Sequence, residues 1–243
     1  MKSLHALPAL TALSLLLCMP SAHADPHNAR ATASLNNLSI TWDDLNAEDG
    51  AVAGVWLNPG PSSTSTAAAW RDATWHWQSQ YDQLGSHGMV LDFGEIHNTV
   101  EPFALASSAS ATLPDSALFG ITRLSYSYFA SQYTMVNVQG VTFSDVAHAG
   151  VGSARTEIVM NLYMGGELRS TSTVVNDGGL ASLPLGGYFA TSNEGFGELE
   201  ILIKTTAATA LLPVPEPHSY AMMLAGVAVL AGAVRRRKPG PAA

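Results

Sequence analysis

Short stretches in which apolar and polar residues alternate, separated by turn residues, recur along most of this chain. Leu38, Ile40 and Trp42 alternate with Ser39 and Thr41, which is the period of a half-buried strand. Similar patterns predict strands within 52–57, 103–113, 118–129, 133–143, 156–164, 168–175 and 197–205. Turn residues fill 43–50, 58–64 and 176–179, and Gly165-Gly166 predicts a two-residue hairpin loop. Strands at this spacing, with no helical periodicity between them, predict an all-β antiparallel β-sandwich or jelly-roll-like body.

One stretch, 70–84, supports two interpretations. Trp70, Trp77 and Leu84 belong to a set of apolar positions at helical spacing. Trp75 and Trp77, however, flank His76 as the side chains of one strand face would. The β-rich sequence on both sides favours a strand.

Cysteine is almost absent from the chain. Cys18 is the only one, and it lies in an apolar N-terminal segment. Lys2 precedes this segment, Pro20 ends it, and Ala22 and Ala24 are the small residues that a signal peptidase requires. Residues 1–24 are therefore predicted to be a signal peptide cleaved after Ala24. The rest of the chain then has no disulfide, no catalytic thiol and no thiolate metal ligand.

The segment 213–243 has three parts. Val214-Pro215-Glu216-Pro217 comes first, and its prolines fix φ and lack backbone donors, so we expect an extended, accessible segment. An uncharged apolar run follows, and 219–234 is predicted to be a transmembrane helix of roughly 24 Å. Arg235, Arg236, Arg237 and Lys238 come last. Their positive charge predicts that this end lies on the cytoplasmic side of the membrane.

These three parts, in this order, resemble the PEP-CTERM sorting signal of exported bacterial proteins. The resemblance implies an exosortase as the processing partner. It also implies a transient anchor in the inner membrane, and release to the cell surface or the extracellular space. An ordinary membrane anchor is the alternative, but it leaves Pro215-Glu216-Pro217 unexplained. The predicted organisation is a signal peptide at 1–24, a β-sandwich body at 25–206, a linker at 207–212 and the sorting signal at 213–243.

The predicted mature body is strongly acidic. Without Lys2 and the four cations of the tail it keeps six of the eleven basic residues, and without Glu216 it keeps eighteen of the nineteen acidic ones. The resulting net charge of −12 disfavours binding to nucleic acid and to anionic lipid. We therefore expect no nucleic-acid partner.

An acidic turn follows the first predicted strand. It contains five residues with side-chain oxygens, the ligand type that calcium prefers: Asp43, Asp44, Asn46, Glu48 and Asp49. Gly50, however, comes one place too late for an EF-hand loop. The sequence thus allows a calcium site here, and the alternative is a solvated acidic turn. No other cofactor is expected.

No catalytic motif is present, and we predict a protein that is not an enzyme. Asp92 and Glu95 are the carboxylates that a secreted hydrolase would use. His87 and His97 lie near them in the sequence, but not at a spacing typical of zinc ligands. A hydrolase is therefore the least favoured of three functional classes.

The tryptophans distinguish the other two classes. Exposed Trp rings stack on sugar rings, whereas buried ones fill a core. Trp42 and Trp56 are predicted to be core residues. Trp75 and Trp77, which flank the polar His76, are the candidates for sugar binding, and the alternative is that they too fill the core. The favoured function is a non-enzymatic surface or matrix protein associated with exopolysaccharide in a biofilm. The alternative is a carbohydrate-binding module that uses Trp75 and Trp77.

Overall fold

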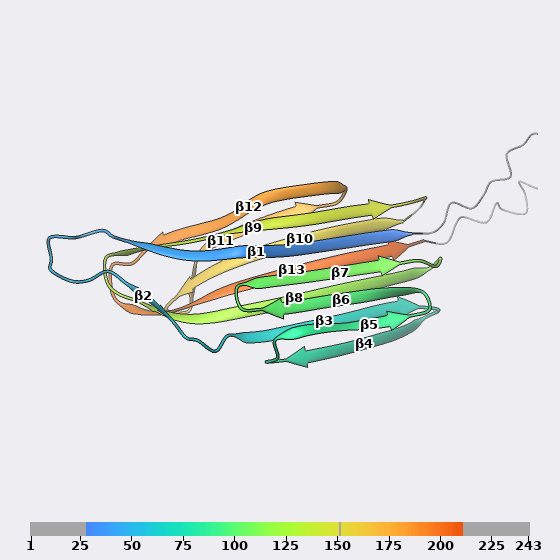
Figure 1. Cartoon of the computed structure of the whole chain (residues 1–243), viewed down its shortest axis with the longest axis horizontal. Helices are drawn as coiled ribbons and strands as arrows, with labels where there is room; N and C mark the ends of the chain where they lie inside the picture. Colours follow the sequence, from blue (N-terminus) through green and yellow to red (C-terminus); the bar gives the residue numbers. More distant parts are fainter. Residues whose placement is uncertain (1–27, 151, 211–243) are drawn as a thin grey trace, which may run out of the picture. The chain divides into compact units, whose positions relative to one another are not determined.

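The chain divides into two units, residues 1–210 and residues 211–243. The computed structural model describes residues 28–150 and 152–210, all in the first unit, and every regular element in these ranges is a β-strand. The strands form two antiparallel sheets packed face to face, which confirms the predicted sandwich (Figure 1). Residues 1–24 and 213–243, with the predicted transmembrane helix at 219–234, lie outside the described residues.

The first sheet has six strands in the order β12-β9-β1-β7-β6-β5. Their bounds are β1 Ala29–Asp44, β5 Gly85–Leu91, β6 Gly94–Glu101, β7 Ala104–Ala111, β9 Thr134–His148 and β12 Gly179–Ala190. The second sheet has seven strands in the order β11-β10-β13-β8-β3-β4, with β2 also paired to β8. Their bounds are β2 Val55–Leu57, β3 Ser62–Arg71, β4 Thr74–Tyr81, β8 Ser116–Ala130, β10 Ser153–Met164, β11 Glu167–Asn176 and β13 Gly195–Thr209.

Several element boundaries differ from the prediction. Residues 62–64, expected in a loop, begin β3, and residues 85–87, whose composition suggests a turn, begin β5. Strands β5, β6 and β12 were not predicted, because glycine, proline or histidine interrupts their apolar alternation. Strand β13 continues to Thr209, so residues 207–209 are strand rather than linker. Within 70–84 the strand interpretation is confirmed by β3 and β4.

A bulge in β1 changes which residues face the core. Ala29, Ala31, Ala33 and Leu35 point inward, and the register against β9 then shifts between Asn36 and Ser39. Asn37 adopts a φ of 56° there, which Asn tolerates better than most residues. The shift turns the following even-numbered positions inward, so that Leu38 joins the core and Ile40 packs against it.

The core between the sheets has two apolar clusters. One contains large side chains such as Leu124, Leu162 and Ile201. The other is rich in alanine, including Ala31, Ala67 and Ala109. Small side chains let the backbones of the two sheets approach more closely there than large ones would.

A belt of buried polar side chains crosses the core between these clusters. The Asn98 amide on β6 donates to the Thr66 carbonyl at 2.9 Å, and the Ser107 hydroxyl donates to Asn98 Oδ1 at 2.7 Å. Ser107 also lies 2.7 Å from the Thr205 hydroxyl on the opposite sheet. Each bond joins a side chain on one sheet to its neighbour or to the facing sheet. The belt therefore fixes the position of one sheet relative to the other along the strand direction.

Candidate functional site

The outer face of the second sheet carries an aromatic patch at the β3–β4 end. Trp75 and Trp77 are 59% and 72% exposed, and they lie opposite Trp70 and Ala68 of β3. The neighbours Ala67 and Ala69 are buried, so these positions face away from the core. The ring of Trp75 stacks on Phe119 of β8, with a centroid distance of 6.0 Å and an interplanar angle of 30°. We call Trp70, Trp75, Trp77 and Phe119 the Trp75 patch.

A second aromatic group lies on the same face, ten residues further along β8. Trp56 of β2 and Phe196 of β13 both pair with Phe129, and their ring centroids lie 5.8 and 5.3 Å from its ring. Trp56 is 56% exposed and Phe196 is 75% exposed. At about 3.3 Å per residue, Phe119 and Phe129 are separated by roughly 33 Å along the strand. We call Trp56, Phe129 and Phe196 the Trp56 patch.

Polar side chains occupy the outer face between the two patches. The Arg123 guanidinium lies 2.6 Å from Glu200, and the Asn161 amide donates to the same carboxylate at 3.0 Å. Lys204 and Glu157 form an ion pair at 3.0 Å. Loss of solvent and the Glu200 carboxylate raise the pKa of the Tyr163 hydroxyl. This stretch therefore presents charged and hydrogen-bonding groups that neighbouring strands hold in place.

The structure corrects the prediction for two tryptophans. Trp42 and Trp56 were expected in the core, but they are 46% and 56% exposed. Trp42 lies near the end of β1, where the strand runs on into the exposed acidic turn, and Trp56 faces outward against Phe129. Trp75 and Trp77, the predicted sugar-binding pair, lie side by side on one exposed face. The sequence did not indicate Phe119, Phe129 or Phe196, because only strand pairing brings them beside the tryptophans.

The acidic turn is exposed and held by its own hydrogen bonds. Asp44 accepts from the Asn46 amide N–H at 2.8 Å. Asp49 accepts from the Ala51 N–H at 2.7 Å and from the Asn46 side chain at 3.2 Å. Asp43 lies near the end of β1, and Glu48 is exposed within the turn. Across residues 28–150 and 152–210, no three His, Cys, Asp or Glu side chains are arranged to hold a metal. Calcium binding at this turn stays a prediction.

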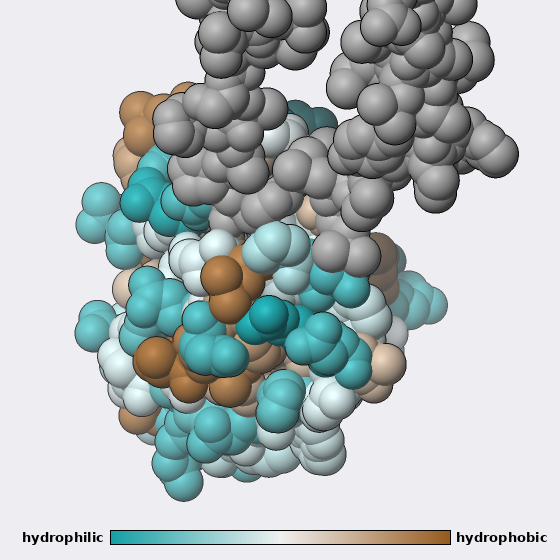
Figure 2. All heavy atoms as spheres, turned by 90° about the vertical axis from the view of Figure 1, so that its right-hand side faces the viewer, coloured by the Kyte–Doolittle hydropathy of each residue, from teal (hydrophilic) through white to brown (hydrophobic). Residues whose placement is uncertain are grey.

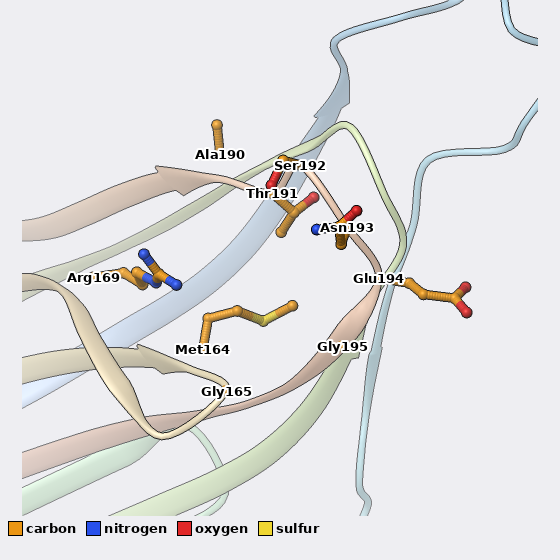
Figure 3. A pocket seen from close by; sticks show the side chains of 9 residues that line it. All are labelled: Met164, Gly165, Arg169, Ala190, Thr191, Ser192, Asn193, Glu194 and Gly195. Atoms are coloured by element: carbon orange, nitrogen blue, oxygen red, sulfur yellow. The ribbon is translucent and has the colours of Figure 1, made fainter.

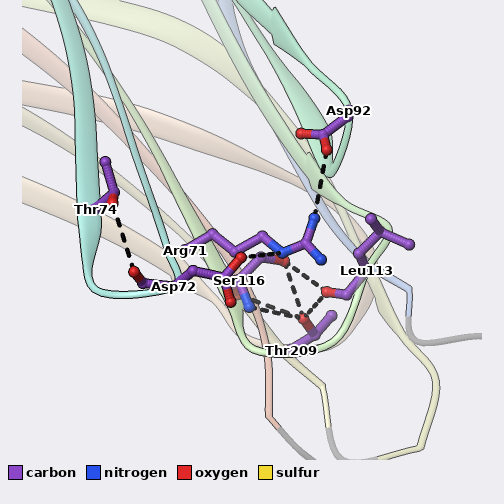
Figure 4. Close-up of polar contacts among 7 residues, drawn as sticks. All are labelled: Arg71, Asp72, Thr74, Asp92, Leu113, Ser116 and Thr209. Atoms are coloured by element: carbon purple, nitrogen blue, oxygen red, sulfur yellow. Dashed lines mark hydrogen bonds and ion pairs between the residues drawn. The ribbon is translucent and has the colours of Figure 1, made fainter.

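The two carboxylates suggested for a hydrolase each lie near a basic side chain. Asp92, in the turn between β5 and β6, lies 3.6 Å from the Arg71 guanidinium of the opposite sheet, which also contacts Asp72 at 3.5 Å (Figure 4). Glu95 lies 3.4 Å from His97 Nε2, and both side chains are more than half exposed. His97 of β6 pairs with Gly88 of β5, and His87 is the next residue along β5. Successive residues of a strand point to opposite faces. The two histidines therefore point to opposite faces of the sheet.

An open hollow lies at one end of the sandwich, where the β10–β11 hairpin meets the β12–β13 loop (Figure 3). Its volume of about 200 Å³ is below the range of about 300–1,000 Å³ that is usual for small-molecule sites. Arg169 and Met164 line it, whereas Glu194 points away from it. The opposite end presents small apolar groups between hydrophilic side chains (Figure 2). That end also has an open hollow of about 360 Å³, which His148, Arg155 and Asp177 help to line.

Other predicted site residues lie outside the described ranges. These are Ala22 and Ala24 of the cleavage site and all residues of the sorting signal. In the part of the chain that the structure describes, no helix is long and apolar enough to cross a membrane.

Comparison with known proteins bears on the tail alone. Residues 213–238 match the family model of the PEP-CTERM protein-sorting motif. Searches of curated proteins and of solved structures gave no match. The matched range includes Val214 to Pro217, the apolar run and the cluster from Arg235 to Lys238. The chain therefore carries a PEP-CTERM sorting motif, which implies an exported protein that an exosortase sorts.

Proposed function

We propose that this protein is a non-enzymatic component of the cell surface or extracellular matrix that binds exopolysaccharide through the outer face of its second sheet. The observation that carries this proposal is the exposure of Trp75 and Trp77 on one strand face, beside Phe119. Two large aromatic side chains left in solvent, beside the half-buried Phe119, cost free energy unless a partner covers them, which makes such a patch a candidate binding surface.

The chemistry of this face suits a sugar polymer. A sugar ring has apolar faces, which stack on aromatic rings, and hydroxyl groups at its edge, which form hydrogen bonds. The two aromatic patches offer the first kind of contact, and Arg123, Asn161 and Glu200 between them offer the second. The strand geometry separates the patches by roughly 33 Å, a span that suits a chain of several sugars rather than one. The acidic body argues against an anionic membrane as the alternative ligand.

Binding rather than hydrolysis is favoured by the surroundings of the carboxylates. Glycoside hydrolysis uses two carboxylates on either side of the bond that is cut. On the outer face of the second sheet, Glu198 and Glu200 are both paired with Arg123, at 3.7 and 2.6 Å. Asp92 and Glu95 belong to the other sheet and its turn, and not to the sheet face that carries the aromatic patches.

The experiment is a binding assay on the polysaccharide of the producing bacterium. The double variant Trp75→Ala with Trp77→Ala should bind at least about tenfold more weakly, because it removes both rings of the patch. Its melting temperature should stay within a few degrees of wild type, since neither side chain is in the core. Tyr188→Ala, which removes a 70% exposed aromatic ring from β12 of the other sheet, is the matched control and should bind normally.

The length of the sugar ligand tests the role of the second patch. Trp56→Ala with Phe196→Ala should weaken the binding of long chains and leave the binding of short oligosaccharides unchanged, because a short ligand cannot reach both patches. Undiminished binding by the Trp75 and Trp77 variant would contradict the proposal. So would a large loss of stability in that variant, because it would show that the pair is part of the core.

A further inference from the structure

The two sheets have four edge strands, and three of them carry features that discourage pairing with another chain. Strand β12 contains Pro184, which lacks a backbone donor, and β5 contains Gly88 in its interior. Strand β11 carries Glu167 and Arg169, and its register against β10 is interrupted by a bulge. Charges, prolines, glycines and bulges are the usual protection of an exposed edge.

The fourth edge, β4, has none of these features. Its eight residues, Thr-Trp-His-Trp-Gln-Ser-Gln-Tyr, include no charge, no proline and no glycine. Its register against β3 is continuous from Thr64–Tyr81 to Arg71–Thr74. Residues 74–78 are all exposed, and β4 forms the free margin of its sheet (Figure 1). Such a strand is a template for an additional antiparallel strand.

We propose that β4 pairs with β4 of a second copy of this chain. A two-fold axis through His76 would join the two second sheets into one, with their outer faces on the same side. In this register Trp75 of each copy lies opposite Trp77 of the other, and aromatic pairs in such positions stabilise a sheet. The two Trp75 patches then form one continuous aromatic surface.

Charge favours this register over the one with its axis through Trp77. Asp72 and Asp82 lie just beyond the two ends of β4. With the axis through Trp77, the turn residues Asp72 of one copy and Asp82 of the other would come close to each other beyond the ends of the paired strands, and like charges repel. With the axis through His76, Asp72 lies opposite the uncharged Gln80. The strand is therefore self-complementary in a register that avoids carboxylate pairs.

Charge substitutions test the interface and its register together. Sedimentation of the exported wild-type protein should show a concentration-dependent dimer. Thr74→Lys with Gln78→Lys places lysines opposite one another twice and should weaken dimerisation at least about tenfold. Thr74→Glu with Gln78→Lys places opposite charges face to face in the same register and should restore the dimer. As a control, Thr173→Lys with Val175→Lys, on edge strand β11, should leave the dimer unchanged.

A cysteine at the axis gives an independent measurement. Directly opposite residues of antiparallel strands have Cα atoms about 4.5–5.5 Å apart, which a disulfide can span. After loss of Cys18 with the signal peptide, His76→Cys would be the only thiol, and mild oxidation should give a covalent dimer. Thr173→Cys should remain uncrosslinked. A wild-type protein that is monomeric at all concentrations, or a dimer unaffected by the lysine pair on β4, would overturn the proposal. All these variants keep Trp75 and Trp77, so polysaccharide binding remains a separate readout.

Discussion

At the scale of single residues, Tyr128 shows how burial links stability to pH. Its ring is 3% exposed and packs near Phe189, and its hydroxyl donates to the Tyr163 carbonyl at 2.6 Å. Burial raises the pKa of the Tyr128 hydroxyl well above its ordinary value. A phenolate at this position would have no hydration and could not donate the hydrogen bond to the Tyr163 carbonyl. The Tyr128 hydroxyl therefore stays protonated in the folded state at a pH near 10, at which it loses its proton in the unfolded state.

We therefore expect the free energy of unfolding to be insensitive to this group below about pH 10 and to fall as the pH rises above it. For one proton the slope is at most about 1.4 kcal/mol per pH unit. Tyr128→Phe should cost about 1 kcal/mol at neutral pH through the lost hydrogen bond, and should make the alkaline decline shallower. Urea unfolding between pH 8 and 11 measures both effects. Equal slopes for wild type and variant would show that Tyr128 does not cause the decline.

At the scale of elements, the hairpin between β10 and β11 turns through two glycines, and the Gly165 N–H donates to the Phe196 carbonyl of β13 at 2.9 Å. Met164 pairs with Glu167, and the loop residues Gly165 and Gly166 have φ values of 61° and 80°. A two-residue loop with two positive φ angles is a type I′ turn. A Cβ added at either glycine would meet nothing within 4 Å, so a substitution there tests conformational strain without a steric clash.

Gly165→Val should lower the free energy of unfolding by about 1–2 kcal/mol, because a β-branched residue is strained at positive φ. Gly165→Asn is the matched variant, since Asn tolerates this conformation, and it should unfold within about 0.5 kcal/mol of wild type. Chemical denaturation of the two variants gives the comparison. Equal losses for Val and Asn would mean that side-chain contacts, rather than φ, control this turn.

The same hairpin illustrates what the sequence can predict. Gly165-Gly166 specifies its turn locally, and the flanking apolar alternation specifies its strands, so both were predicted. Strand β12 was not, because Pro184 and Gly186 are poor strand residues that only pairing with β9 keeps in the sheet. Of the Trp75 patch, the sequence indicated the pair Trp75 and Trp77 but not their neighbour Phe119. The spacing of Trp75 and Trp77 placed both on one face, but the partner Phe119 depends on β3 lying between β4 and β8, which is set by the fold as a whole.

At the scale of the whole molecule, both the core and the end of β13 show how the body is held without disulfides. The polar belt through Asn98, Ser107 and Thr205 joins the two sheets across the core. At the end of β13, the Ser116 amide N–H donates to the Thr209 hydroxyl at 3.3 Å, and the Ser116 and Thr209 hydroxyls both donate to the Leu113 carbonyl (Figure 4). Within the described residues, these hydrogen bonds hold the end of β13 at Thr209, and the sorting motif begins further along the chain at residue 213.

This arrangement leads to a prediction about processing. In cells that have an exosortase the tail should be removed, and mass spectrometry of the surface protein should find no peptide beyond Val234. Replacing Pro215-Glu216-Pro217 by three alanines should leave the tail in place, because it removes the two prolines on which the predicted extended segment depends. Processed and unprocessed protein should melt at the same temperature, since Leu113, Ser116 and Thr209, which hold the end of β13, are all retained after cleavage. Recovery of Arg235 to Lys238 on the mature surface protein would contradict cleavage. A lower melting temperature after cleavage would instead show that the tail contributes to the stability of the body.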